Sequence, residues 1–214
     1  MKILPFDKCT TDMLEAAFRI RRVPIEQLGS DWIQARHPIP DNKKEFLFEL
    51  AERLFEYRNY WNEMELRTRF IGPVLELVDF SGPGYNSFAD RNLKAVVGDV
   101  ELSGKTDWMT ATGKSRPVRP FFFLHEYKKL RIESPDPQGQ LLAAMFAAQA
   151  LNNDRQPVYG CYTVAQYWTF VLLNADRYSV SEGYDASSHE IQIVWSILCE
   201  TKKRIEQRVQ EAGL

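Results

Sequence analysis

Two carboxylates and one ammonium group in this sequence are spaced so that they could meet at a single site. Asp107 lies on one predicted strand, and Glu126 and Lys128 lie two residues apart on the next. Because the side chains of a strand alternate between its two faces, Glu126 and Lys128 are expected on one face, and His125 and Tyr127 on the other. The pattern predicts a cluster of two acids and a lysine at the ends of neighbouring strands.

Carboxylate oxygens of this kind suit Mg²⁺ or Mn²⁺ rather than zinc, for which histidine and thiolate ligands are typical. A metal ion held by Asp107 and Glu126 would polarise a phosphodiester and lower the pKa of a bound water. Lys128 could orient that water or stabilise the charge that develops on the phosphoryl oxygens. The alternative is that the three side chains form an ion-pair network with a purely structural role.

The strand that carries Glu126 is expected at 118–128 and is predicted to belong to the core. Its apolar run Phe-Phe-Phe-Leu, directly before the site, is typical of a strand buried on both faces. Further strands are expected at 95–102 and 106–111, separated by Gly104, so that the three strands form a meander. The charged side chains would therefore emerge at the end of a rigid element.

Helical and extended patterns surround these strands. Helices are expected at 11–22, 43–57, 62–78, 138–151 and 190–210, with a hairpin of strands at 158–164 and 167–173 and a further strand at 177–180. This order predicts an α/β fold with a central mixed sheet of four or five strands flanked by helices. Residues 1–58 are expected to form an N-terminal helical extension, and residues 59–214 the main domain.

The composition is that of a globular protein. The chain has 214 residues, of which 44% are hydrophobic and 26% charged, so one sizeable core is expected and disorder as the main state is excluded. No apolar run approaches the roughly 20 residues that span a bilayer, and the start of the chain lacks the apolar segment of a signal peptide. Cys9, Cys161 and Cys199 are far apart, which favours reduced thiols. We expect a cytoplasmic protein with no membrane partner.

The net charge of −2 argues against a protein that coats nucleic acid through bulk positive charge. A local basic groove beside an acidic metal site remains compatible with this charge. Two examples of basic clusters that could contact phosphates are Lys114/Arg116/Arg119 and Lys128/Lys129/Arg131.

The motifs, taken in order, resemble those of the PD-(D/E)xK phosphodiesterase superfamily. In the segment 62–75, a glutamate precedes an arginine, followed by Phe-Ile and then by Pro and Leu. This segment is similar to the acidic first helix in relatives of the nuclease domain of type I restriction enzymes. The resemblance covers the chain from about Tyr60 onward and implies a restriction-endonuclease-like fold. Thr106 stands where the family name has proline, a substitution that the superfamily tolerates.

The resemblance also assigns roles to five residues. It implies that Glu63 is the helical carboxylate and a further metal ligand, that Asp107 and Glu126 are the metal-binding pair, and that Lys128 is the catalytic lysine. Gln140, near the start of the helix that follows the catalytic strand, resembles the glutamine that accompanies such sites. Glu65 competes with Glu63 for the helical role, because side chains two positions apart on a helix point about 200° apart. The spacing to the following arginine favours Glu63.

These observations predict a Mg²⁺- or Mn²⁺-dependent phosphodiesterase that cleaves DNA, in restriction, defence or repair. A second hypothesis is a protein with the nuclease fold that binds nucleic acid or a protein partner without cutting. The sequence leaves open the choice between DNA and RNA and the oligomeric state, a homodimer included.

Overall fold

The computed structural model describes residues 2–128 and 136–213. The first part of the chain contains mainly helices, and the rest contains most of the sheet. The elements before the sheet's long strands are β1 (Lys2–Pro5), η1 (Phe6–Lys8), α1 (Thr11–Phe18), β2 (Arg21–Arg22), α2 (Ile25–Leu28), α3 (Ser30–Ile33), α4 (Asp41–Tyr57), α5 (Glu63–Leu66), η2 (Arg67–Ile71) and α6 (Gly72–Val78). They are followed by β3 (Asn86–Val97), β4 (Val100–Thr112), β5 (Val118–Lys128), α7 (Pro137–Asn152), β6 (Val158–Val164), β7 (Tyr167–Asn174), β8 (Arg177–Asp185) and α8 (Ile191–Glu211). The predicted basic residues Lys129 and Arg131 lie outside the described residues.

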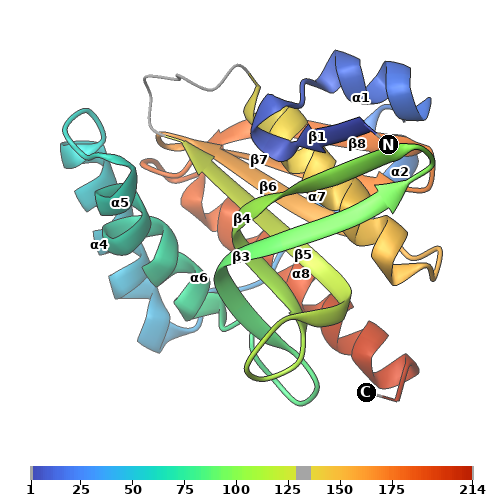
Figure 1. The fold of residues 1–214 in the computed structure, drawn as a ribbon. Coiled ribbons are helices and arrows are strands. Elements are labelled where there is room, and N and C mark those ends of the chain that lie inside the picture. Colours follow the sequence, from blue (N-terminus) through green and yellow to red (C-terminus); the bar gives the residue numbers. More distant parts are fainter. Residues whose placement is uncertain (1, 129–135, 214) are drawn as a thin grey trace.

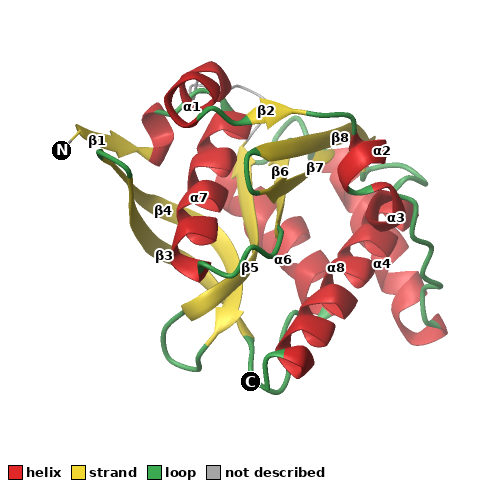
Figure 2. Ribbon diagram, turned by 90° about the vertical axis from the view of Figure 1, so that its right-hand side faces the viewer, coloured by secondary structure: helices red, strands yellow, loops and turns green. Residues whose placement is uncertain are grey.

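The strands form one mixed sheet, in the order β1-β4-β5-β6-β7-β8-β2, with β3 paired to β4 (Figure 1). The pairs β1/β4, β5/β6 and β2/β8 are parallel, and the other pairs are antiparallel. Figure 2 shows β5 between α7 on one side and α8 on the other. The sheet therefore separates two apolar cores, one packed under α7 and α1 and the other under α4, α6 and α8. The α/β class with a mixed sheet flanked by helices is confirmed.

The sheet has eight strands, so the predicted four or five are too few. The strands missing from the prediction include β1 and β2, which are short and lie in the part of the chain expected to be helical. Strands of this length carry no readable alternation, and they are extended because β4 and β8 supply their hydrogen-bond partners. The predicted helix 11–22 ends at Phe18, where Arg19 adopts a left-handed conformation with φ of 55°.

The first hairpin also differs from the prediction. Its turn lies at Gly98, with φ of 59°, and not at Gly104, so that β4 runs without interruption to the site. Gly104 has a different role: a Cβ atom there would lie 2.5 Å from the ring of Phe6. This glycine therefore permits a close approach of η1 to the sheet and does not mark a turn.

No helix of the described residues is both long and apolar enough to cross a membrane.

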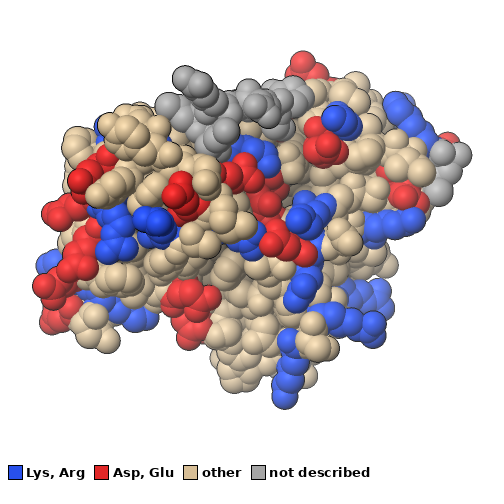
Figure 3. Space-filling model, turned by 60° about the vertical axis from the view of Figure 1, so that its left-hand side comes forward, with Lys and Arg blue, Asp and Glu red and all other residues tan. Residues whose placement is uncertain are grey.

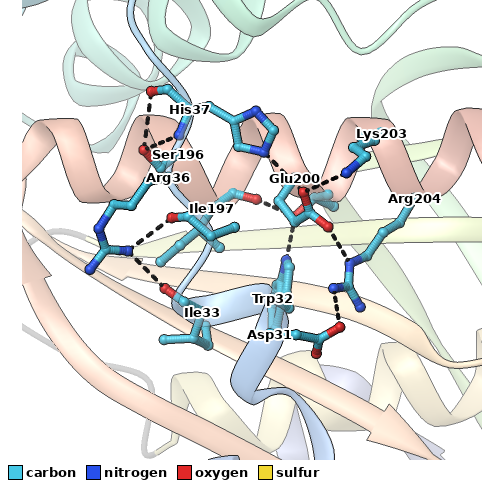
Figure 4. Close-up of polar contacts among 12 residues, drawn as sticks. Asp31, Trp32, Ile33, Arg36, His37, Ser196, Ile197, Glu200, Lys203 and Arg204 are labelled. Atoms are coloured by element: carbon cyan, nitrogen blue, oxygen red, sulfur yellow. Dashed lines mark hydrogen bonds and ion pairs between the residues drawn. The ribbon is translucent and has the colours of Figure 1, made fainter.

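The N-terminal segment is joined to α8 by buried and half-buried contacts (Figure 4). Trp32 is fully buried and its Nε1 donates to Oγ1 of Thr201 at 2.8 Å. Arg204 lies between Asp31, at 2.7 Å from Nη2, and Glu200, at 3.0 Å from Nε. These contacts attach Asp31 and Trp32 to the last helix.

Candidate active site

Asp107 lies where two strands leave the same edge of β4. Residues 108–112 of β4 pair with β5, residues 100–103 pair with β1, and Asp107 lies in the stretch between them. The Asp107 carboxylate accepts a hydrogen bond at 3.1 Å from the backbone N–H of Tyr127. The β4–β5 ladder ends at the pair Trp108 and His125, so beyond it the side chain of Asp107 accepts the hydrogen bond of a β5 backbone N–H.

Glu126 lies at the centre of the site. Its side chain is almost completely buried, and Oε1 accepts hydrogen bonds from Nζ of Lys128 at 2.6 Å and from Nε2 of Gln140 at 2.7 Å. Lys128 lies on the same face of β5 as Glu126, as strand alternation predicts. Gln140 reaches Glu126 from the first turn of α7, which packs against this face of the sheet.

Burial, and secondly the negative charge of Asp107, raise the pKa of Glu126 to about 8, against the opposing effect of Lys128. Burial alone would lower the pKa of Lys128. The carboxylates of Glu126, Asp107 and Glu63 offset this effect, so the pKa of Lys128 is raised and the lysine is charged at neutral pH. The site therefore combines a permanent positive charge with a carboxyl group whose charged form is disfavoured until another cation is close.

The choice between Glu63 and Glu65 is explained by the start of α5. Asn62 caps this helix by accepting from the Glu65 N–H at 2.9 Å, and Glu65 accepts from the Asn62 N–H at 2.9 Å. This reciprocal capping box occupies the Glu65 carboxylate. Glu63 is not used in the cap, and its charge acts on both Lys128 and Tyr127. Glu63 is therefore the glutamate of this helix that lies near the site.

The oxygen atoms at the site fit a small hard cation. Nε2 of Gln140 donates a hydrogen bond to Glu126. The buried Oε1 of Gln140 has no hydrogen-bond partner within the part of the chain that the structure describes. Two carboxylates, of Asp107 and Glu126, and this amide oxygen are the donor types that Mg²⁺ and Mn²⁺ prefer. Among the described residues no three acids, histidines or cysteines form a metal-binding group, so Glu63 as a third ligand stays a prediction.

His125 has the expected position in the core, on the face opposite Glu126. It is 1% exposed, and its Nε2 lies 2.7 Å from Oγ1 of Thr163. Burial lowers the pKa of His125 to about 3, so the imidazole is neutral. His125 packs against the rings of Trp168 and Tyr127, which explains its burial. Its imidazole therefore lies apart from the carboxylates of the site.

The sequence singles out Arg67 by its spacing from Glu63 and as half of the basic pair Arg67/Arg69, and the structure adds it to the surroundings of the site. Its Nη1 donates to Oδ2 of Asp90 at 2.8 Å, and its guanidinium carbon lies 5.6 Å from the centroid of the Tyr127 ring. The sequence signal for this position is the four-residue spacing, which places Glu63 and Arg67 on one helix face. Asp90, 23 residues away from Arg67, has no such signal.

Acidic and basic side chains lie close together on one face of the molecule. Figure 3 shows red and blue groups close together in the middle of the visible face, below the atoms drawn in grey. A column of Lys and Arg side chains continues from there toward the lower end of the molecule. This face is therefore not uniformly acidic.

No protein-family model and no curated protein sequence matches this chain.

The raised pKa of Glu126 predicts a pH dependence of stability in the metal-free protein. The pKa of Glu126 is about 8 in the folded state and about 4.5 for an ordinary glutamate, so proton binding by Glu126 stabilises the folded protein. This contribution to the free energy of unfolding is complete below about pH 4.5 and is lost as the pH rises through about 8. Glu126→Gln should remove most of this decline, which we expect to be on the order of a few kcal/mol. Urea unfolding in EDTA across this range measures it. The exposed variant Glu52→Gln is the control, and equal slopes in all three proteins would contradict the assignment.

Proposed function

We propose that this chain is a Mg²⁺- or Mn²⁺-dependent phosphodiesterase that cleaves DNA, with the restriction-endonuclease-like fold of the PD-(D/E)xK superfamily. The proposal is carried by one observation: the Glu126 carboxylate binds both Lys128 and Gln140, and the charge of Asp107 acts on it at the same point. These are four of the five residues that the resemblance assigns to the site. They come from two strands and a helix that bury the acid.

Each side chain has a distinct role in this proposal. A divalent cation, when bound, supplies positive charge to the phosphodiester and makes a coordinated water more acidic. Asp107, Glu126 and the Oε1 of Gln140 would hold it. The Nε2 of Gln140 fixes the orientation of Glu126 through its 2.7 Å hydrogen bond. The ammonium of Lys128 stabilises negative charge that grows on the phosphoryl oxygens as the nucleophile attacks.

A cleavage assay on the wild-type protein tests the proposal. Supercoiled plasmid, linear duplex, single-stranded DNA and RNA should be incubated with Mg²⁺, Mn²⁺, Ca²⁺ or EDTA. We expect nicking or cutting of DNA with Mg²⁺ or Mn²⁺ and none with Ca²⁺ or EDTA, because Ca²⁺ binds oxygen ligands with a looser geometry. Binding of DNA without cleavage in every condition would replace the enzyme by the non-catalytic binding protein. A preference for RNA would correct the substrate.

Metal binding gives a second expected result. Mg²⁺ or Mn²⁺ should raise the melting temperature, because neighbouring carboxylates repel one another until a cation neutralises them. At a metal concentration 100 times the dissociation constant, the stabilisation is about 2.7 kcal/mol. Asp107→Asn should lose most of this response, whereas Asp99→Asn, in the exposed β3–β4 turn, should keep it. Titration calorimetry and thermal unfolding measure both. An equal metal response in the two variants would place the metal site elsewhere and leave the ion-pair interpretation.

A further inference from the structure

Arg67 is placed by an unusual turn of helix. The segment η2 is a π-helix, in which the N–H of Gly72 donates to the carbonyl of Arg67, five residues earlier. A Cβ atom at Gly72 would lie 3.0 Å from that carbonyl oxygen, so glycine suits this close contact. Turns of this kind are rare and occur frequently at functional sites. Here the turn follows directly after α5, the helix that carries Glu63.

The guanidinium of Arg67 is held in a fixed position by Asp90. Oδ2 of Asp90 accepts from Arg67 at 2.8 Å, and Oδ1 lies 3.6 Å from Nζ of Lys105. Asp90 itself has a positive φ of 54°, a conformation that aspartate adopts more readily than most residues. Arg67 is thus oriented by an acid from β3, over the ring of Tyr127 from β5. Its side chain remains 20% exposed.

Two groups of hydrogen-bond donors at this place have no acceptor among the described residues. Nη1 of Arg67 donates a hydrogen bond to Asp90. Its Nη2 and Nε donate to no acceptor among the described residues. The Tyr127 side chain is 97% buried, since only 3% is exposed, and its hydroxyl has no partner within the described chain. A buried donor such as this hydroxyl is rarely left without an acceptor in folded proteins, whereas the free N–H groups of Arg67 belong to a partly exposed side chain. An additional group with acceptor oxygens would satisfy both.

We propose that Arg67 and Tyr127 bind a phosphate group of the nucleic acid backbone beside Asp107. This inference rests on the proposed function, because it names the part of the substrate that these residues contact. A guanidinium presents N–H groups in a planar fork that matches two phosphate oxygens. Asp107 lies close enough to act electrostatically on both Arg67 and Tyr127. The phosphate would therefore lie next to Asp107, one of the two carboxylates proposed to hold the metal ion.

Arg67→Ala tests the phosphate contact, with Arg69→Ala as the matched control from the same π-helical segment. Arg69 is exposed and has no ion pair among the described residues. The first measurement is binding of a fluorescein-labelled DNA duplex in Ca²⁺ at several salt concentrations. Loss of one phosphate contact should weaken binding of all sequences alike and reduce the salt slope by about 1. Tyr127→Phe should weaken binding about 10-fold, as expected for a hydrogen bond to a charged group.

The second measurement is single-turnover cleavage in Mg²⁺ or Mn²⁺. Arg67→Ala should lose on the order of 10²–10³ in rate, and Arg67→Lys should lose less, because lysine keeps the charge but not the fork. Added guanidinium ion should restore part of the Arg67→Ala rate. A purely structural role for Arg67 would give no such rescue and no change in salt slope.

The outcomes separate this inference from the proposed function. If the wild type cuts DNA and Arg67→Ala binds and cuts equally well, the phosphate contact is wrong and the nuclease proposal stands. If the wild type binds DNA with an Arg67-dependent salt slope but never cuts, the phosphate contact stands and the catalytic proposal fails. Absence of both binding and cleavage by the wild type overturns both.

Discussion

Lys128→Ala should abolish detectable DNA cleavage while leaving metal binding and DNA binding close to those of the wild type. The lysine is proposed to stabilise charge that exists mainly in the transition state, so its loss should appear in the rate and not in the affinity. Loss of an electrostatic stabiliser of this kind typically costs on the order of 10²–10³ in rate. Plasmid nicking and single-turnover cleavage of a labelled duplex measure the defect.

The structure offers a closely matched control for this variant. Lys94 binds the buried Glu101 at 2.8 Å, as Lys128 binds Glu126 at 2.6 Å, but the first pair lies near the β3–β4 turn. Lys94→Ala should therefore reproduce any general effect of removing a lysine from a buried carboxylate and should retain cleavage. Glu126→Ala should lose both metal binding and cleavage. If Lys128→Ala cuts as well as Lys94→Ala, Lys128 is a packing residue of the sheet and the proposed mechanism is wrong.

The parts of the site that could be predicted are those set by local periodicity. The apolar run before Glu126 indicated a buried strand, and alternation placed Lys128 on the same face as the acid. Gln140, by contrast, was assigned to the site by the family resemblance and by its place in the helix that follows this strand. These relationships span few residues or follow the order of elements, so one sequence contains them.

The features that could not be predicted depend on partners distant in the sequence. Gly104 has the local appearance of a strand break, but Phe6 packs against it and β4 continues. The strands β1 and β2 are extended only because of the edges that they join. Likewise, nothing near Asp90 in the sequence indicates that it orients Arg67. Tertiary contacts in each case decide a conformation that local propensity leaves open.

The competition between Glu63 and Glu65 shows how a local motif can settle such an ambiguity. Asparagine followed three residues later by glutamate is the pattern of a capping box, in a variant with asparagine at the cap. The capping contacts of Asn62 and Glu65 leave the other glutamate near the site. The sequence therefore contained the discriminating signal in addition to the spacing from Arg67.

Trp32→Ala is expected to destabilise the whole chain by about 3–5 kcal/mol, the usual cost of removing a fully buried aromatic side chain. Trp32 is 0% exposed, and its ring packs edge-on against Tyr159 and Phe170, with centroid distances of 5.1 and 5.8 Å. These two partners belong to β6 and β7, strands of the predicted main domain. The variant therefore asks whether residues 1–58 form an appendage or a part of the same folding unit.

One cooperative transition, shifted strongly to lower urea, is the expected result for Trp32→Ala in equilibrium unfolding. Trp32→Phe should lose less stability, because it keeps an aromatic ring in the core. Its remaining cost includes the lost hydrogen bond to Thr201. Phe55→Ala, which changes a side chain that is 62% exposed, should stay within about 0.5 kcal/mol of the wild type. A main transition at the wild-type position in Trp32→Ala, with a separate loss of N-terminal structure, would show that the first 58 residues are an extension that folds independently of the sheet. The strong destabilisation that we expect would instead place the N-terminal segment in the core that supports the candidate active site.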